Sequence, residues 1–261
     1  MHFDSKLREY YTRRSEADRL GTREGHLEHA RSKELIARYL PDPPMRIIDI
    51  GGGTGTYASW LASLGYDVHM VDVMDGHVEA AAAVGSFTAA VGDARALEAS
   101  ANSYDGALLL GPLYHLPKRD DRLLALREVV RVVRPGGVVI AAFISRLAIP
   151  LDAYVKGWID MERGLAGLSN AVQIGHDADG GFGAIAYFHL PSEISPELLS
   201  AGLEVQHVLG VEGPGWIAPD FDGRWADPGR RQAILDCARQ CEALPELLGL
   251  SPHIIAIARN T

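Results

Sequence analysis

Acidic residues and glycines gather in the first half of the chain at spacings that suit a nucleotide-like ligand. Asp49 stands just before the glycine-rich run Gly51–Gly55, and Asp72 and Asp93 follow further along. Glycine has no Cβ, so the backbone in such a run can approach a bound molecule closely. A carboxylate such as Asp72 can accept both hydroxyls of a ribose in charge-assisted hydrogen bonds. His115 adds an imidazole, which exchanges protons near neutral pH. Together these residues predict cofactor binding beside acid–base chemistry.

Alternating strands and helices must position these residues. Apolar runs bounded by glycine, proline or aspartate predict strands at 47–50, 67–72, 86–91, 104–110 and 138–144. Apolar residues at helical spacing predict helices at 26–40, 56–64, 75–84 and 119–133. Strands joined through helices form a parallel sheet with right-handed crossovers. Ligands of such sheets bind at the carboxyl ends of the strands, where the strand order reverses. We therefore expect the acidic residues, the glycines and His115 to meet at that edge.

The glycine run fits two classes of ligand. Residues 53–58 match the G-x-G-x-x-A fingerprint of dinucleotide sites, and Asp72 follows at the distance expected for a ribose-binding acid. An NAD-dependent oxidoreductase is therefore one interpretation. However, Asp49 beside the glycines would repel a pyrophosphate and favour a cationic ligand. The Arg-Pro-Gly-Gly run at 134–137 is also not required by a dehydrogenase.

The whole pattern is more specific than the glycine run alone. In order, it comprises D-I-G-G-G-T-G from Asp49, V-D-V around Asp72, G-D-A-R around Asp93, L-G-P-L-Y-H-L around Gly111 and R-P-G-G before the fifth strand. Over residues 45–144 this pattern resembles class I S-adenosylmethionine-dependent methyltransferases. The resemblance implies S-adenosyl-L-methionine as cofactor and S-adenosyl-L-homocysteine as product. It also implies a set of cofactor-binding residues: Asp49, Gly51, Gly53, Gly55, Asp72, Val73, Met74, Asp93, Ala94 and Gly111.

The resemblance also implies the fold. We expect an α/β, Rossmann-like, doubly wound and mostly parallel sheet of seven strands, closed by strands at 203–211 and 253–258. Further helices are expected at 147–168, 191–202 and 234–247. We expect a single methyltransferase domain over residues 1–261. Its parts are an N-terminal helical cap (1–44), the cofactor-binding core (45–144), a substrate-cover insertion after the fifth strand (145–188) and the completion of the sheet (189–261).

The expected reaction is methyl transfer to oxygen or nitrogen of a small metabolite, such as a natural-product intermediate. The loop after the fourth strand resembles that of enzymes acting on small metabolites and lacks the Asn/Asp-Pro-Pro-Tyr signature of amino-nucleobase methylation. His115 is the first candidate for a general base, with Tyr11 as the second; alternatively, His115 only orders its loop. Candidate substrate-binding residues are Tyr10, Tyr11, Tyr114, His115, His189 and Trp216. A catalytically silent nucleotide-binding or scaffold protein is the remaining alternative.

Composition and residue spacing limit the binding partners that we expect. A net charge of −9 and a pI of about 5.5 disfavour nucleic acid, which binds basic surfaces. We expect no metal, because neither Cys237 and Cys241 nor His176 with Asp177 and Asp179 comes with a further ligand at fixed spacing. The charged N-terminus and the short apolar run at 138–144 predict no signal peptide, no membrane partner and a cytoplasmic location. The sequence carries no signal for an oligomeric state.

Overall fold

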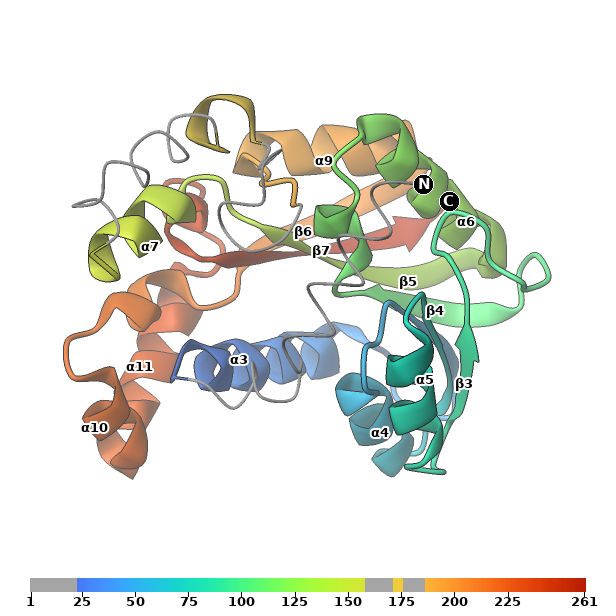
Figure 1. Cartoon of the computed structure of the whole chain (residues 1–261), viewed down its shortest axis with the longest axis horizontal. Helices are drawn as coiled ribbons and strands as arrows, with labels where there is room; N and C mark the ends of the chain where they lie inside the picture. Colours follow the sequence, from blue (N-terminus) through green and yellow to red (C-terminus); the bar gives the residue numbers. More distant parts are fainter. Residues whose placement is uncertain (1–22, 158–170, 176–185) are drawn as a thin grey trace. The chain divides into compact units, whose positions relative to one another are not determined.

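The computed structural model describes residues 23–157, 171–175 and 186–261 of the chain. A seven-stranded sheet runs through it in the order β3-β2-β1-β4-β5-β7-β6 (Figure 1). The described residues divide into two compact units. The core unit comprises Ile36–Ala142, Ser195–His207 and Ala256–Thr261. The second unit comprises the described residues of Met1–Leu35, Phe143–Ile194 and Val208–Ile255.

The strands expected in the first half of the chain are present. They are β1 (Arg46–Ile50), β2 (Asp67–Asp72), β3 (Thr88–Val91), β4 (Tyr104–Leu109) and β5 (Val133–Ile144). The pairs β1–β2, β1–β4, β2–β3 and β4–β5 are all parallel. β1 and β4 are neighbours although two strands separate them in sequence, so the strand order reverses between them. This confirms the doubly wound topology and fixes the edge at which a ligand is expected.

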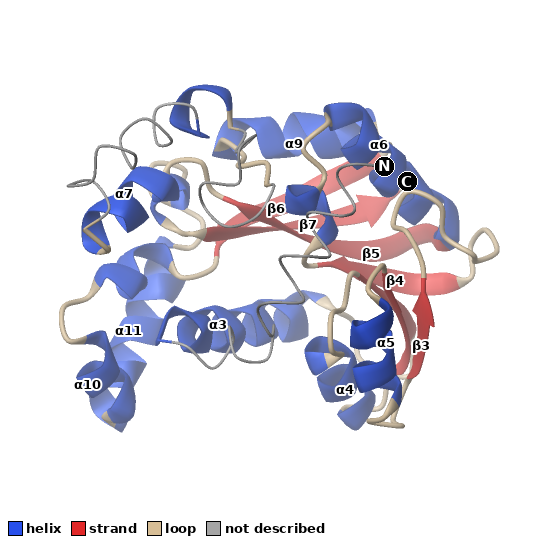
Figure 2. Cartoon of the chain, viewed as in Figure 1, coloured by secondary structure: helices blue, strands red, loops and turns tan. Residues whose placement is uncertain are grey.

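The four helices expected before the fifth strand are present (Figure 2). Those before β5 are α3 (Arg23–Tyr39), α4 (Thr56–Ser63), α5 (Asp75–Ala82), the 3-10 turn η1 (Pro112–His115) and α6 (Arg119–Val132). Later elements are α7 (Ala148–Val155), α9 (Pro191–Ser200), β6 (Leu203–Gly210), η3 (Gly213–Ile217), α10 (Phe221–Ala226), α11 (Pro228–Cys241), η4 (Leu248–Leu250) and β7 (His253–Asn260). None of the helices in the described ranges is long and apolar enough to cross a membrane.

Two local predictions were wrong. Arg-Pro-Gly-Gly does not precede β5 but forms a bulge inside it, because Tyr104 pairs with Val133 whereas Gly106 pairs with Val138. The left-handed φ of +79° at Gly136 accommodates the extra residues. α11 begins at Pro228, six residues earlier than expected, and ends at Cys241. Its start is fixed by Asp227, whose side chain accepts a hydrogen bond from the Arg230 amide.

Some predictions fall on residues that the structure does not describe. The helix expected over 147–168 is present as α7 up to Val155, and the remainder lies outside the described residues beyond 157. The N-terminal arm, including Tyr10 and Tyr11, also lies outside them.

Candidate functional site

The predicted cofactor residues lie at the carboxyl ends of β1 to β4 in the core unit. Asp49 lies near the end of β1 and is level with Met70 of β2 and Leu108 of β4. Asp72 is the last residue of β2. The strands β3 and β4 lead into Asp93 and Gly111 respectively. Parallel pairing therefore gathers these segments at one edge of the sheet, where the strand order reverses.

The glycine loop is held close to neighbouring segments. The Gly51 amide donates a hydrogen bond to the Val71 carbonyl at 2.6 Å. Gly51 has a left-handed φ of +72°, and a Cβ there would lie 2.7 Å from the ring of Pro112. A Cβ at Gly52 would lie 2.7 Å from Oδ2 of Asp49. Side chains at either position would force the loop away from η1 and from β1, so the glycines are required for this compact cradle.

The Asp72 carboxylate holds the glycine loop after β1 and the turn after β2. Its Oδ2 accepts a hydrogen bond from the Gly53 amide at 2.9 Å, and its Oδ1 accepts one from the Met74 amide at 2.9 Å. The Nδ1 of His77 lies 3.2 Å from Oδ1. A carboxylate has about four acceptor positions, so the carboxylate that braces the loop keeps capacity for a ligand. Sequence reasoning missed His77, since its position two residues into α5 gave no sign that it turns back to Asp72.

Asp49 is a buried acid with an unsatisfied oxygen. Only 1% of the residue is exposed, and within the described part of the chain its Oδ2 has no hydrogen-bond partner. Burial, together with the nearby charge of Asp72, raises the pKa of Asp49 to about 7. A cationic ligand group near Asp49 would stabilise its ionised form.

Asp93 is engaged within its own turn. Arg95 donates to it from its backbone amide at 2.9 Å and from its guanidinium, with Nη2 2.6 Å from Oδ2. Burial alone would raise the pKa of Asp93, but the hydrogen bonds from Arg95 outweigh burial and hold the pKa below its usual value. The buried Ala94 lies between them. Arg95 belongs to the G-D-A-R pattern, but the sequence did not predict that its guanidinium donates hydrogen bonds to both oxygens of Asp93.

The segment after β4 folds back on the strand it leaves. The Tyr114 hydroxyl donates to the Leu110 carbonyl at 2.8 Å, which fastens η1 to the end of β4. The ring of His115 stands edge-on to that of Tyr114, with centroids 4.7 Å apart. Both side chains are half-buried beside Gly111. His115 thus lies in the segment after β4, as expected, and the Tyr114 hydroxyl stabilises that segment.

Two predicted substrate residues lie in the core of the second unit. His189 is fully buried, edge-on to Phe143 and Tyr187 at centroid distances of 4.7 Å and 4.6 Å. Trp216 is 2% exposed, and its indole N–H donates to the Leu250 carbonyl at 2.8 Å. Trp216 packs with Leu27 and other buried apolar residues. These contacts are those of core side chains, and sequence alone did not distinguish them from pocket residues.

Comparison with known proteins relates this architecture to methyltransferases. Residues 48–141 match the sequence profile of a family described as methyltransferase domain. An O-methyltransferase of Pyrenophora dematioidea is 32% identical over 112 residues, which is 40% of this chain and 40% of the relative. The matched part thus spans about two fifths of the length of this relative and of a mycobacterial methyltransferase that is 35% identical over 105 residues.

Solved structures share the fold over nearly the whole chain. A SAM-dependent methyltransferase from Thermotoga maritima superposes with a TM-score of 0.62 at 18% identity, covering 98% of this chain and 100% of the other. A SAM-dependent methyltransferase from Methanosarcina mazei gives a TM-score of 0.58 at 19% identity, covering 86% and 96% respectively. At these identities the likeness shows the fold alone, a Rossmann-like α/β sheet flanked by helices.

Proposed function

We propose that the chain transfers a methyl group from S-adenosyl-L-methionine to a small metabolite, on the premise that residues 48–141 match the sequence profile of a family described as methyltransferase domain. The family match favours this reading over an NAD-dependent oxidoreductase. The observation that carries the proposal is the chemistry at the edge of the sheet: a buried acid, a glycine cradle and a second acid that braces the loop.

These residues fit the proposed cofactor. Its ammonium group would satisfy the buried Oδ2 of Asp49, which has no partner within the described residues. A ribose hydroxyl suits the acceptor position that Gly53, Met74 and His77 leave on Asp72. Val73 and Met74 follow Asp72 and offer apolar surface to an adenine. The Ala94 amide offers a hydrogen-bond donor to the adenine edge, while Asp93 keeps its turn in shape through Arg95.

The chain's contribution to the reaction is mainly alignment. When bound, the cofactor supplies an electrophilic methyl group on a positively charged sulfur. Holding an acceptor in line with that group is worth several orders of magnitude in rate. His115 accepts the proton of an acceptor O–H or N–H at an imidazole nitrogen. Tyr114 positions that loop through its hydrogen bond to Leu110, and Tyr11 stays the second candidate for the base.

The acceptor class rests on similarity and charge. The relative from Pyrenophora dematioidea is named an O-methyltransferase, which supports transfer to oxygen, and we extend the proposal to nitrogen of small natural-product intermediates. The net charge of −9 argues against nucleic acid as the acceptor. We further propose that residues 1–44 and 145–188 cover the acceptor, with Tyr10 and Tyr11 contributing to its binding.

Calorimetric titration with S-adenosylhomocysteine and, separately, with NAD tests the cofactor. We expect saturable binding of S-adenosylhomocysteine and none of NAD; the reverse result would move the chain to the oxidoreductases. Incubation with isotope-labelled S-adenosylmethionine and a panel of small phenols, carboxylic acids and amines then tests transfer. Binding without transfer to any member of the panel would favour a silent cofactor-binding protein.

A further inference from the structure

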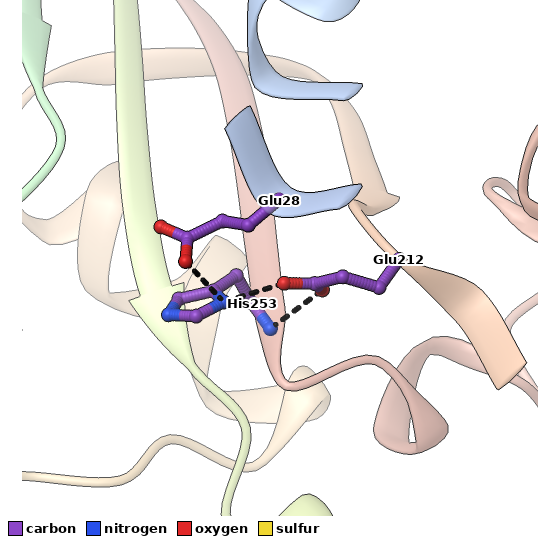
Figure 3. Close-up of side chains that lie close together, drawn as sticks. All are labelled: Glu28, Glu212 and His253. Carbon is purple, nitrogen blue, oxygen red and sulfur yellow. Dashed lines mark hydrogen bonds and ion pairs between the residues drawn. The ribbon is translucent and has the colours of Figure 1, made fainter. Parts of the chain in front are cut away.

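Three side chains from distant segments of the second unit converge on one point (Figure 3). Glu28 comes from α3, Glu212 follows β6 and His253 is the first residue of β7. One potential ligand atom from each lies within 4.8 Å of the other two. We propose that Glu28, Glu212 and His253 bind a divalent first-row transition-metal ion.

The distances centre on one nitrogen. The Nδ1 of His253 lies 2.6 Å from Oε1 of Glu212 and 3.8 Å from Oε2 of Glu28. Nδ1 carries at most one proton, and the short contact with Glu212 uses it. A separation of 3.8 Å is too long for a hydrogen bond. The approach of Glu28 to this nitrogen is therefore not a second hydrogen bond, and it suits two ligands of a shared cation.

The surrounding structure aims Glu212 at the same point. Its Oε2 accepts hydrogen bonds from the Ser251 hydroxyl at 2.7 Å and from the His253 amide at 3.0 Å. Ser251 is fully buried and also accepts a hydrogen bond from the Glu212 amide at 2.9 Å. This leaves Oε1 directed at the imidazole. Hydrogen bonds of this kind orient the direct ligands in established metal sites.

Burial makes the two carboxylates unusual. Glu28 is 8% exposed and Glu212 is 2% exposed, yet both face one imidazole. Carboxylates at such depth are normally paired with cations or coordinate metals. A divalent cation would balance both carboxylates at once.

The donor set indicates which metals fit. One imidazole nitrogen with two carboxylate oxygens suits Zn²⁺, Mn²⁺, Fe²⁺ or Co²⁺ better than Mg²⁺ or Ca²⁺, which favour oxygen-only ligands. Three protein ligands leave at least one coordination position for water or a further ligand. On binding, the Nδ1 proton is displaced, so the imidazole presents its lone pair to the metal. The ion would join α3 to the segments at the end of β6 and the start of β7.

The test is a metal titration of the untagged full-length chain after treatment with chelator. Co²⁺ is the probe, followed by its visible absorption and by calorimetry, with no methyl donor present, so the outcome is independent of the proposed methyl transfer. We expect one Co²⁺ per chain. Glu28→Gln and His253→Gln should each weaken binding by about 100-fold or more, since loss of a supporting residue alone costs 10–100-fold. The control variants, His207→Gln and Glu204→Gln, change two exposed residues of β6 and should bind as the wild type does.

If His253→Gln fails to fold, Glu28→Gln decides the test, because the hydrogen bonds that the structure describes for the Ser251 hydroxyl are with Glu212 and Gly213. Absence of a Co²⁺ signal at one equivalent would overturn the proposal. Equal affinity in Glu28→Gln and the control variants would do the same. The three residues would then form a hydrogen-bonded cluster without a metal.

Discussion

The substitution Asp49→Asn should change stability and ligand affinity in opposite directions. Asp49 is 1% exposed, and burial beside Asp72 raises its pKa from 3.8 to about 7. Between about pH 4 and pH 7, Asp49 is therefore protonated in the folded chain but ionised in the unfolded chain. In this window the free energy of unfolding falls as pH rises, and above about pH 7 the full cost remains.

The expected magnitude follows from that pKa. From pH 5 to about pH 7, two pH units at 1.36 kcal/mol each amount to about 2–3 kcal/mol. Asparagine has no charge to bury. The free energy of unfolding of Asp49→Asn, measured relative to the wild type without ligand, should therefore rise by about 2–3 kcal/mol between pH 5 and pH 8.

Ligand affinity should respond the other way. The ionised Asp49 is expected to meet the ammonium of the cofactor, and hydrogen bonds to charged groups contribute about 1.5–3 kcal/mol. Asp49→Asn should therefore bind S-adenosylhomocysteine roughly tenfold to a hundredfold more weakly at pH 8.

Urea denaturation at pH 5, 6, 7 and 8 checks the first expectation, and calorimetry at pH 8 checks the second. Asp67→Asn is a matched control, because Asp67 lies at the other end of β2 with an exposed side chain. It should change neither quantity appreciably. A stability difference between Asp49→Asn and wild type that stays constant across pH would refute the burial argument. Unchanged affinity would refute the assigned role.

Three further substitutions separate binding, chemistry and folding. Asp72→Ala should lose about 2–3 kcal/mol of S-adenosylhomocysteine affinity by calorimetry, since its carboxylate also holds the Gly53 and Met74 amides; wild-type affinity would argue against a ribose contact. His115→Ala should lower kcat about 10²–10⁴-fold with cofactor affinity unchanged, and an unaltered rate would leave His115 as a residue that orders its loop. Arg122→Met should lower the free energy of unfolding, measured by urea denaturation, by roughly 3–5 kcal/mol. The reason is that Glu197 stays buried but loses its ion pair with Arg122 at 2.8 Å. A loss below about 1 kcal/mol would mean that the pair is not buried in solution.

Local patterns predicted the first half of the fold well. The apolar runs of β1, β2 and β4 and the glycines that follow them fixed the strands to within a residue or two. Parallel pairing then brought Asp49 and Asp72 to the same edge, because that consequence follows from topology alone. β5 was predicted five residues too short, since Arg-Pro-Gly-Gly reads locally as a turn and only pairing with β4 turns it into a bulge.

The partners of the site residues were less predictable. Two contacts, between His77 and Asp72 and between Arg95 and Asp93, depend on side-chain rotamers within their turns. Sequence spacing does not specify these rotamers. The burial of Trp216 depends on packing against Leu27, nearly two hundred residues away in sequence. Glu28, Glu212 and His253 likewise come together only through the tertiary fold. No spacing in the sequence indicated this cluster.

The most direct test of the central claim is a crystal structure of the chain with S-adenosylhomocysteine. The account predicts the ligand at the carboxyl ends of β1, β2 and β4. Its ribose hydroxyls should lie within hydrogen-bond distance of the Asp72 carboxylate, and its ammonium should lie next to Asp49. A ligand bound elsewhere, or one whose ammonium points away from Asp49 while another residue holds the ribose, would contradict the account.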